Sequence, residues 1–140
     1  MTSADGIHRL HYLGAVDMAE LVDSGGRSIE EQIVDAVEAA QLGGALPTSG
    51  SRLVAVHVSK IGIKLVAEAD QAVVDRLALH KIVQALSFDD GFGRANVVLV
   101  EKKSSDDVQC HLLQTASGTE ADHLCRQIRQ AFHSAVVDSS

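Results

Sequence analysis

The sequence contains few of the residues on which several classes of protein depend. Among its 140 residues none is Trp, one is Tyr and three are Phe, so few rings are present on which nucleic-acid bases could stack. No run approaches the length of about 18 apolar residues that spans a membrane, and the first residues lack the basic and apolar stretches of a signal peptide. Two cysteines are too few for a disulfide scaffold and are typical of a reducing compartment. We therefore expect a cytoplasmic protein.

Basic residues are also scarce. Twelve Lys and Arg stand against 19 Asp and Glu, which gives a net charge of −7. A field of that sign repels nucleic acid and acidic membrane surfaces. The densest basic cluster in the sequence is the pair Lys102-Lys103. We expect no nucleic-acid partner, and contact with a membrane only through other proteins.

The remaining composition is that of one ordinary folded domain. The chain is 46% hydrophobic and 22% charged, and its length suffices for one core. Alternation and turn signals divide it into strands and helices in the order strand, helix, six strands, helix. The expected strands are 9–22 (bulged at Gly14), 52–59, 61–66, 72–77, 82–88, 94–102 and 108–114, and the first helix is 28–42. This order predicts an α+β protein with two packed antiparallel sheets or an open barrel, closed at one end by the last helix.

Capping signals delimit both helices. Ser28 stands three residues before Glu31, which is a capping box, and Gly43-Gly44 is typical of a helix end. We expect Thr119 to cap the last helix. One face of that helix must be buried because apolar residues recur on it at helical spacing. These residues are Ala121, Leu124, Ile128, Ala131, Phe132 and Ala135.

Candidate catalytic and metal-binding residues do not converge. The neighbours Cys110-His111 point to opposite faces of a strand, and His123 and Cys125 lie about 200° apart around a helix. The pair Asp89-Asp90 stands in a Gly-containing turn, where Asp is common because it bonds to nearby backbone groups. We therefore expect no metal, no cofactor and no enzymatic activity.

The segment 82–88 and the last helix together predict a binding groove. A sheet edge beside an apolar helix face can accept an extended peptide through main-chain hydrogen bonds. Phe132 is the candidate anchor on the helix. On periodicity alone it is better explained as a core residue.

Five short motifs resemble those of the phosphotyrosine-binding (PTB) domain family. They are Tyr12-Leu13-Gly14, Ile61-Gly62-Ile63, His80-x-Ile82 with Ser87-Phe88, Cys110-His111 and Ala131-Phe132. The resemblance implies a PH-like fold, in which two near-orthogonal antiparallel sheets with seven strands are capped by the C-terminal helix and an extra helix follows the first strand. It also implies a PTB domain over 7–137, with flexible ends at 1–6 and 138–140.

Within that family, the segments 44–47, 58–64 and 78–93 are most similar to the integrin cytoplasmic domain-associated branch. The tensin-like and malcavernin-like branches are rivals, the tensin-like one because of residues 12–20. The resemblance implies an adaptor at the inner face of the plasma membrane. Its partner would be an NPxY-containing cytoplasmic tail, from an integrin β subunit or a scaffold protein.

The resemblance also implies which residues bind the peptide. Main-chain pairing would come from Ile82, Val83, Gln84, Ala85, Leu86, Ser87 and Phe88, and the apolar pocket from Ile128, Phe132 and Ala135. Members that read phosphotyrosine carry Arg in or near the fifth strand, where this chain has Gln84, so we expect binding that does not require phosphorylation.

Two alternatives remain. One is a PH-like phosphoinositide-binding domain that uses Arg9, Lys60 and Lys64. The other is an interaction domain whose groove is filled by its own chain.

Overall fold

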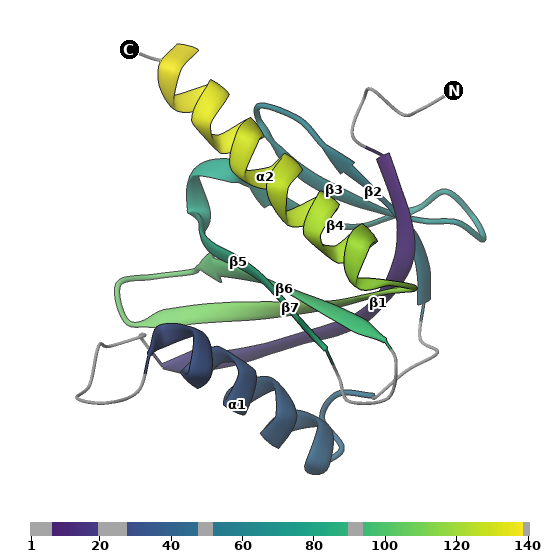
Figure 1. The fold of residues 1–140 in the computed structure, drawn as a ribbon, viewed down its shortest axis with the longest axis vertical. Helices are drawn as coiled ribbons and strands as arrows, with labels where there is room; N and C mark the ends of the chain where they lie inside the picture. The colour runs from purple at the N-terminus through teal and green to yellow at the C-terminus, as the bar shows by residue number, and fades with distance from the viewer. Residues whose placement is uncertain (1–6, 20–27, 48–51, 90–93, 139–140) are drawn as a thin grey trace.

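The computed structural model describes residues 7–19, 28–47, 52–89 and 94–138 (Figure 1). Its elements are β1 (Ile7–Ala19), α1 (Ile29–Leu42), β2 (Arg52–Val58), β3 (Gly62–Ala67), β4 (Val73–Ala78), the 3-10 helix η1 (Leu79–Lys81), β5 (Ile82–Asp89), β6 (Ala95–Lys102), β7 (Asp107–Thr115) and α2 (Gly118–Asp138). Within these residues, the α+β class, the seven strands and the helix after the first strand are confirmed. The expected strand residues 20–22, the turns at 23–26 and 90–93, and the ends 1–6 and 139–140 lie outside the described residues.

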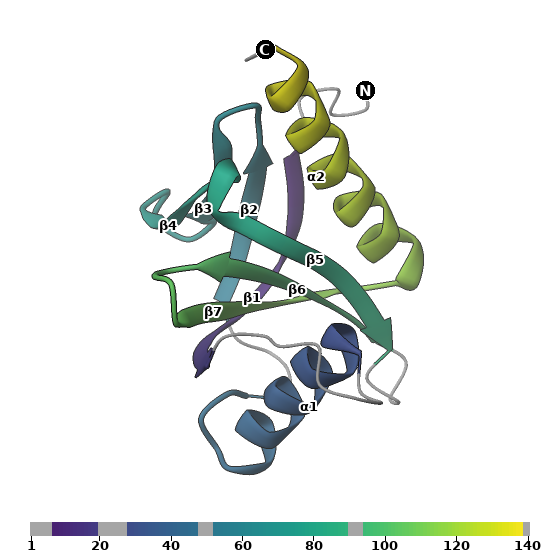
Figure 2. The same cartoon turned by 90° about the vertical axis from the view of Figure 1, so that its left-hand side faces the viewer.

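The described strands form one hydrogen-bonded sheet rather than two separate sheets. The strand order is β4-β3-β2-β1-β7-β6-β5, and every neighbouring pair is antiparallel. The long strand β1 pairs with β2 over its first half and with β7 over its second half. A register shift at Gly14, whose φ is +127°, divides the two halves, and such a bulge bends a strand. Figure 2 accordingly shows β5, β6 and β7 crossing the direction of β2 and β3.

Two apolar clusters cover the two faces of this bent sheet. The first lies between the two halves of the sheet and includes the buried face of α2, formed by Ala121, Leu124, Cys125 and Ile128. The second lies on the opposite face of β6 and β7 and includes Ile33 and Val37 of α1. Each buried aliphatic side chain of this size contributes about 1.5–3 kcal/mol, so α2 is held mainly by its apolar face.

The capping residue predicted for α1 is observed, and the one predicted for α2 is not. Ser28 accepts a hydrogen bond from the backbone N–H of Glu31 at 3.1 Å, and the Glu31 carboxylate accepts the reciprocal bond. The expectation that Thr119 caps α2 is wrong, because the helix already begins at Gly118. The Ser117 hydroxyl accepts from the N–H of Glu120 at 3.2 Å instead, which is the same kind of cap placed two residues earlier.

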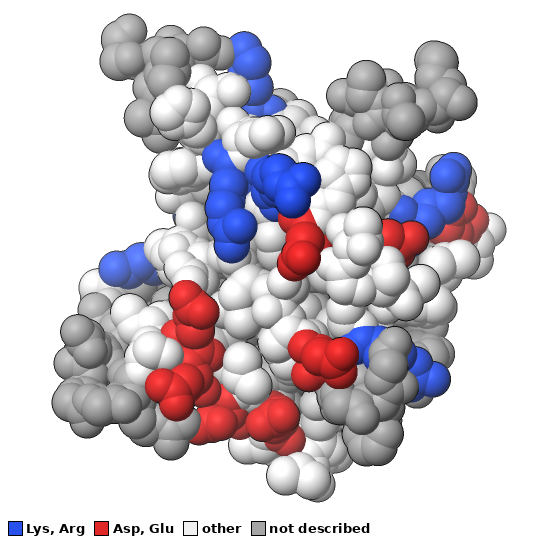
Figure 3. All heavy atoms as spheres, viewed as in Figure 1, with Lys and Arg blue, Asp and Glu red and all other residues white. Residues whose placement is uncertain are grey.

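Charge divides the surface between the two helices. The acidic residues of α1 are Glu30, Glu31, Asp35 and Glu38, and that helix has no basic residue. Figure 3 shows acidic side chains gathered around α1 and basic ones over the middle of α2. Neither described helix combines the length and the apolarity needed to cross a bilayer. The surface beside α2 is therefore the more favourable one for a negatively charged ligand.

Candidate functional site

The strand β5 lies at one end of the sheet. Among the described strands it pairs with β6 only, so the other side of its backbone is an open edge. A register shift between Ile82 and Gln84 places an extra residue, Val83, in the strand, and this side chain is 49% exposed. An open edge presents unpaired N–H and C=O groups to which another extended chain can bind.

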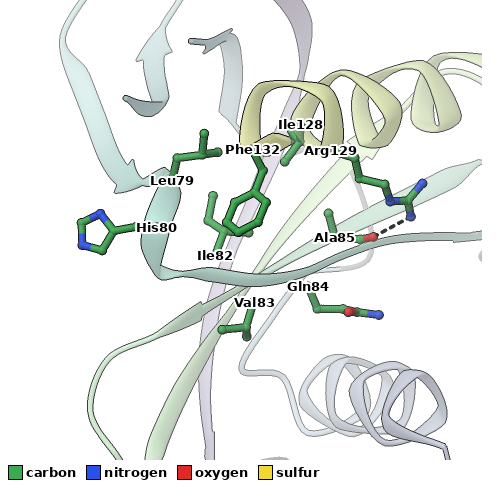
Figure 4. A pocket seen from close by; sticks show the side chains of 9 residues that line it. All are labelled: Leu79, His80, Ile82, Val83, Gln84, Ala85, Ile128, Arg129 and Phe132. Atoms are coloured by element: carbon green, nitrogen blue, oxygen red, sulfur yellow. Dashed lines mark hydrogen bonds between the residues drawn. The ribbon is translucent and has the colours of Figure 1, made fainter. Parts of the chain in front are cut away.

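The helix α2 lies beside this edge and turns it into a groove of about 440 Å³ (Figure 4). The lining residues are Leu79, His80, Ile82, Val83, Gln84, Ala85, Ile128, Arg129 and Phe132. The buried side chains of Ile82 and Ala85 belong to the first apolar cluster. The groove therefore combines an apolar floor with a strand backbone along one wall, which are the two features that bind an extended peptide.

Phe132 lies at the rim of the groove and not in the core. Ile128, one helical turn earlier, is 3% exposed and packs in the first cluster, whereas Phe132 is 43% exposed. Its ring points toward the β5 side of the groove, above Ile82 (Figure 4). The alternative that Phe132 is a buried core residue is thus wrong in this structure, because the apolar stripe of α2 continues beyond the end of the core.

The other predicted residues have different positions. Leu86 packs in the second cluster and Phe88 packs against it, so their side chains lie on the face of the sheet opposite α2. The Ser87 hydroxyl donates to Asp122 Oδ1 at 3.0 Å. Ala135 belongs to α2, and its side chain lies outside the described part of the chain. Of the predicted residues, the groove brings together Ile82, Val83, Gln84, Ala85, Ile128 and Phe132.

Sequence reasoning missed three residues of the groove: Leu79, His80 and Arg129. The last was detectable, because residues three apart on a helix share a face and Arg129 precedes Phe132 by three. Its guanidinium Nη2 donates to the carbonyl oxygen of Ala85 at 3.0 Å (Figure 4). Leu79 and His80 belong to η1, for which the sequence gives no periodic signal.

The two buried thiols, Cys110 on β7 and Cys125 on α2, are not reactive groups. Burial raises the pKa of the Cys110 thiol to about 11, and burial also raises the pKa of Cys125 on α2. Both thiols are therefore protonated near neutral pH, and the thiolate is the nucleophilic form. Among the described residues, no three His, Cys, Asp or Glu side chains cluster to hold a metal ion.

Comparisons with known proteins give a consistent family. A family model described as "Beta-1 integrin binding protein" matches residues 2–140. The chain is similar to "Integrin beta-1-binding protein 1" of Mus musculus, with 29% identity over 135 residues, and of Bos taurus, with 30% identity over 135 residues. Each alignment covers 92% of this chain and 66% of the relative, so the chain spans just under two thirds of the length of the relatives that it matches.

Proposed function

Because this chain belongs to the beta-1 integrin binding protein family, we propose that it is an adaptor module for receptor cytoplasmic tails. It binds an NPxY-type segment, most favourably of an integrin β subunit, as an added antiparallel strand on the open edge of β5. Membership in this family also shows that the chain is a binding protein and not an enzyme.

The observation that carries this proposal is the open edge of β5 beside the exposed ring of Phe132. Main-chain hydrogen bonds along 82–88 supply affinity, and the space between Phe132 and Ile82 receives an apolar residue of the peptide. The interface is small and a flexible tail must be ordered on binding, so we expect a dissociation constant on the order of micromolar.

The proposal includes a PTB domain over residues 7–137 with a PH-like fold. Its support is the bent sheet, in which β1 connects two halves that cross, together with α2 packed on the first cluster. In this interpretation the two near-orthogonal sheets of that fold are the two halves of one sheet that share β1.

Phosphorylation of the NPxY tyrosine is not required for binding. The strand β5 contains no Arg or Lys and ends in Asp89, and the whole chain carries a charge of −7. A phosphate adds about −1.5 to −2 charges at neutral pH, and β5 itself offers it no basic partner. We place the protein in the cytoplasm, at the inner face of the plasma membrane when a receptor tail is bound.

Fluorescence anisotropy with a labelled integrin β-tail peptide tests this function. We expect micromolar binding of the unphosphorylated peptide and equal or weaker binding of the tyrosine-phosphorylated one. Leu42→Ala is the matched control for changes in the groove, because Leu42 is an apolar residue exposed on α1, away from β5. If Phe132→Ala binds the peptide as tightly as Leu42→Ala and wild type do, the proposed groove is contradicted.

A second candidate function, binding to anionic lipid, rests on one observation. Lys64 lies directly opposite Arg76 on β4 and opposite His57 on β2, and these residues line a hollow of about 470 Å³. Like charges opposite each other on neighbouring strands are unfavourable unless an anion lies between them. Arg9, also expected at this site, forms an ion pair with Glu68 at 2.9 Å.

Vesicle co-sedimentation separates the two functions. Lipid binding through this hollow predicts salt-sensitive binding to anionic vesicles that Lys64→Gln abolishes. Peptide binding alone predicts no sedimentation with vesicles.

A further inference from the structure

The strongest unassigned feature of the groove is the hydrogen bond that crosses it. The guanidinium of Arg129 on α2 donates through Nη2 to the carbonyl oxygen of Ala85 at 3.0 Å. Figure 4 shows this side chain extending from the helix toward the strand, beside Phe132. One backbone acceptor of β5 is thus already in use.

That acceptor lies in the middle of the strand on which the proposed function depends. In an antiparallel pair, alternate residues direct both their N–H and their C=O toward the same neighbour. A peptide that adds to the open edge around Ala85 therefore competes with Arg129 for this carbonyl. A hydrogen bond from a charged donor is stronger than one between neutral groups, so the competition is large enough to measure.

We propose that Arg129 determines the ligand specificity of this groove: it occupies one backbone acceptor of the β5 edge in the free protein and pairs with a carboxylate of the bound peptide. This inference rests on the proposed strand addition. A guanidinium presents five N–H donors in a planar fork that matches a carboxylate. A displaced Arg129 therefore gains a charge-assisted bond from an acidic peptide and no comparable bond from a neutral one. The remaining lining residues are apolar or uncharged, apart from His80.

The directions of the elements indicate where the acidic residue stands in the peptide. Three side chains of α2 lie along β5 in the direction of the strand. Phe132 lies near Ile82, Arg129 bonds to Ala85, and Asp122 accepts a hydrogen bond from Ser87. An antiparallel peptide meets them in the reverse order. Its acidic residue therefore precedes the apolar residue that lies under Phe132. The ligand class is an extended peptide with Asp or Glu on the N-terminal side of its apolar anchor.

Arg126 offers a matched control. It carries the same charge on the same helix, it is exposed, and it does not line the groove. Arg126→Met and Arg129→Met thus change the net charge equally, and only the second removes the bond to Ala85. Arg129→Lys keeps the charge but loses the planar fork.

The test compares NPxY peptides that carry Glu or Gln at each of the four positions before the apolar anchor. With the wild-type protein and with Arg126→Met, we expect one Glu peptide to bind about tenfold more tightly than its Gln counterpart. With Arg129→Met this ratio should fall to about one, and the Gln peptide should bind at least as tightly as it binds wild type, because the Ala85 acceptor is released. Arg129→Lys should give an intermediate ratio.

Two results would overturn the inference. One is a Glu-to-Gln ratio that is the same in Arg129→Met and in wild type, and the other is a Gln peptide that loses affinity in Arg129→Met. Thermal unfolding checks that the variants are folded. If Arg129→Met does not fold, the Glu-to-Gln ratio of Arg129→Lys is compared with that of wild type instead. Failure of every peptide to bind wild type would instead contradict the proposed function itself.

Discussion

The Nε2 atom of His111 lies 3.0 Å from Oε1 of Glu101, inside the sheet and away from the groove. The other ring nitrogen, Nδ1, lies 3.1 Å from the hydroxyl of Tyr12 and 3.8 Å from Oδ2 of Asp75. His111 is fully buried on β7, and its partners come from β6, β1 and β4. Side chains thus connect the end strand β4 to the middle of the sheet, without any backbone pairing between β4 and β7.

Removal of the Glu101 carboxylate should destabilise the fold. In Glu101→Ala the buried Nε2 of His111 loses its partner, and an unsatisfied buried group costs about 1–3 kcal/mol. Urea denaturation measures this loss as a lower free energy of unfolding. Glu68→Ala is the control, because the pair of Glu68 with Arg9 lies at the surface and should change stability by less than about 1 kcal/mol. Equal losses in the two variants would contradict a structural role for the buried network.

Alkaline pH should destabilise the protein through Tyr12. Burial, with the negative charges of Asp75 and Glu101, raises the pKa of Tyr12 to about 12, against about 10 in an unfolded chain. Between these values the unfolded chain has lost a proton that the folded protein keeps. The contribution of Tyr12 to the free energy of unfolding is therefore fully present below a pH of about 10, and it is lost as the pH rises toward 12.

Tyr12→Phe isolates this contribution. Its free energy of unfolding, measured in urea at several values between pH 9 and 12, should fall less steeply than that of wild type. Cys110, whose pKa burial raises to about 11, contributes with the same sign in both proteins and cancels in the comparison. Parallel curves for the two proteins would exclude Tyr12 as the titrating group.

Two neighbouring apolar residues of α2 should respond oppositely to truncation. Phe132→Ala should weaken peptide binding by about 1–3 kcal/mol and leave the free energy of unfolding nearly unchanged, because the ring is half-exposed at the groove. Ile128→Ala should lower the free energy of unfolding by about 2–5 kcal/mol, because Ile128 fills the core. Anisotropy titration and urea denaturation of both variants separate the roles. Unfolding of Phe132→Ala would mean that its ring stabilises the core.

Close packing explains the glycine of the Ile61-Gly62-Ile63 motif. A Cβ atom on Gly62 would stand 2.4 Å from the carbonyl oxygen of Leu77 on the paired strand β4. Gly62→Ala should therefore force the strands apart and lower the free energy of unfolding by about 1–3 kcal/mol. Gly118→Ala is the matched control, since no atom lies within 4 Å of its added Cβ. Equal melting temperatures of the two variants would contradict this explanation.

The elements that the sequence predicted are those governed by local rules. Ser28 and Glu31 cap α1 as expected because a capping box needs only four consecutive residues. Alternating apolar residues located β2 to β7, and helical spacing located the buried face of α2. The predicted edge position of 82–88 is also observed, since β5 ends the strand order.

The features that the sequence did not predict depend on contacts between distant segments. A bulge at Gly14 was expected, but the pattern could not show that β1 pairs on both sides and unites the sheet. The bond from Arg129 to Ala85 connects residues 44 positions apart, and no spacing rule reports the reach of a long side chain. The same holds for Glu101, a charged residue near the end of the expected strand 94–102 that is buried against His111.

The two edge strands of the sheet differ in their capacity to pair with a further strand. The outer strand β4 carries the charged pair Asp75-Arg76 and a register shift against β3, which are features that discourage edge pairing. At the opposite end, β5 exposes Val83 beside the uncharged Gln84. If both edges accepted strands, the β5 edge of one copy could pair with the β4 edge of the next, and such a head-to-tail contact can continue from copy to copy into an open filament. With β4 blocked, each molecule has one site for addition and polymerisation stops at a single partner.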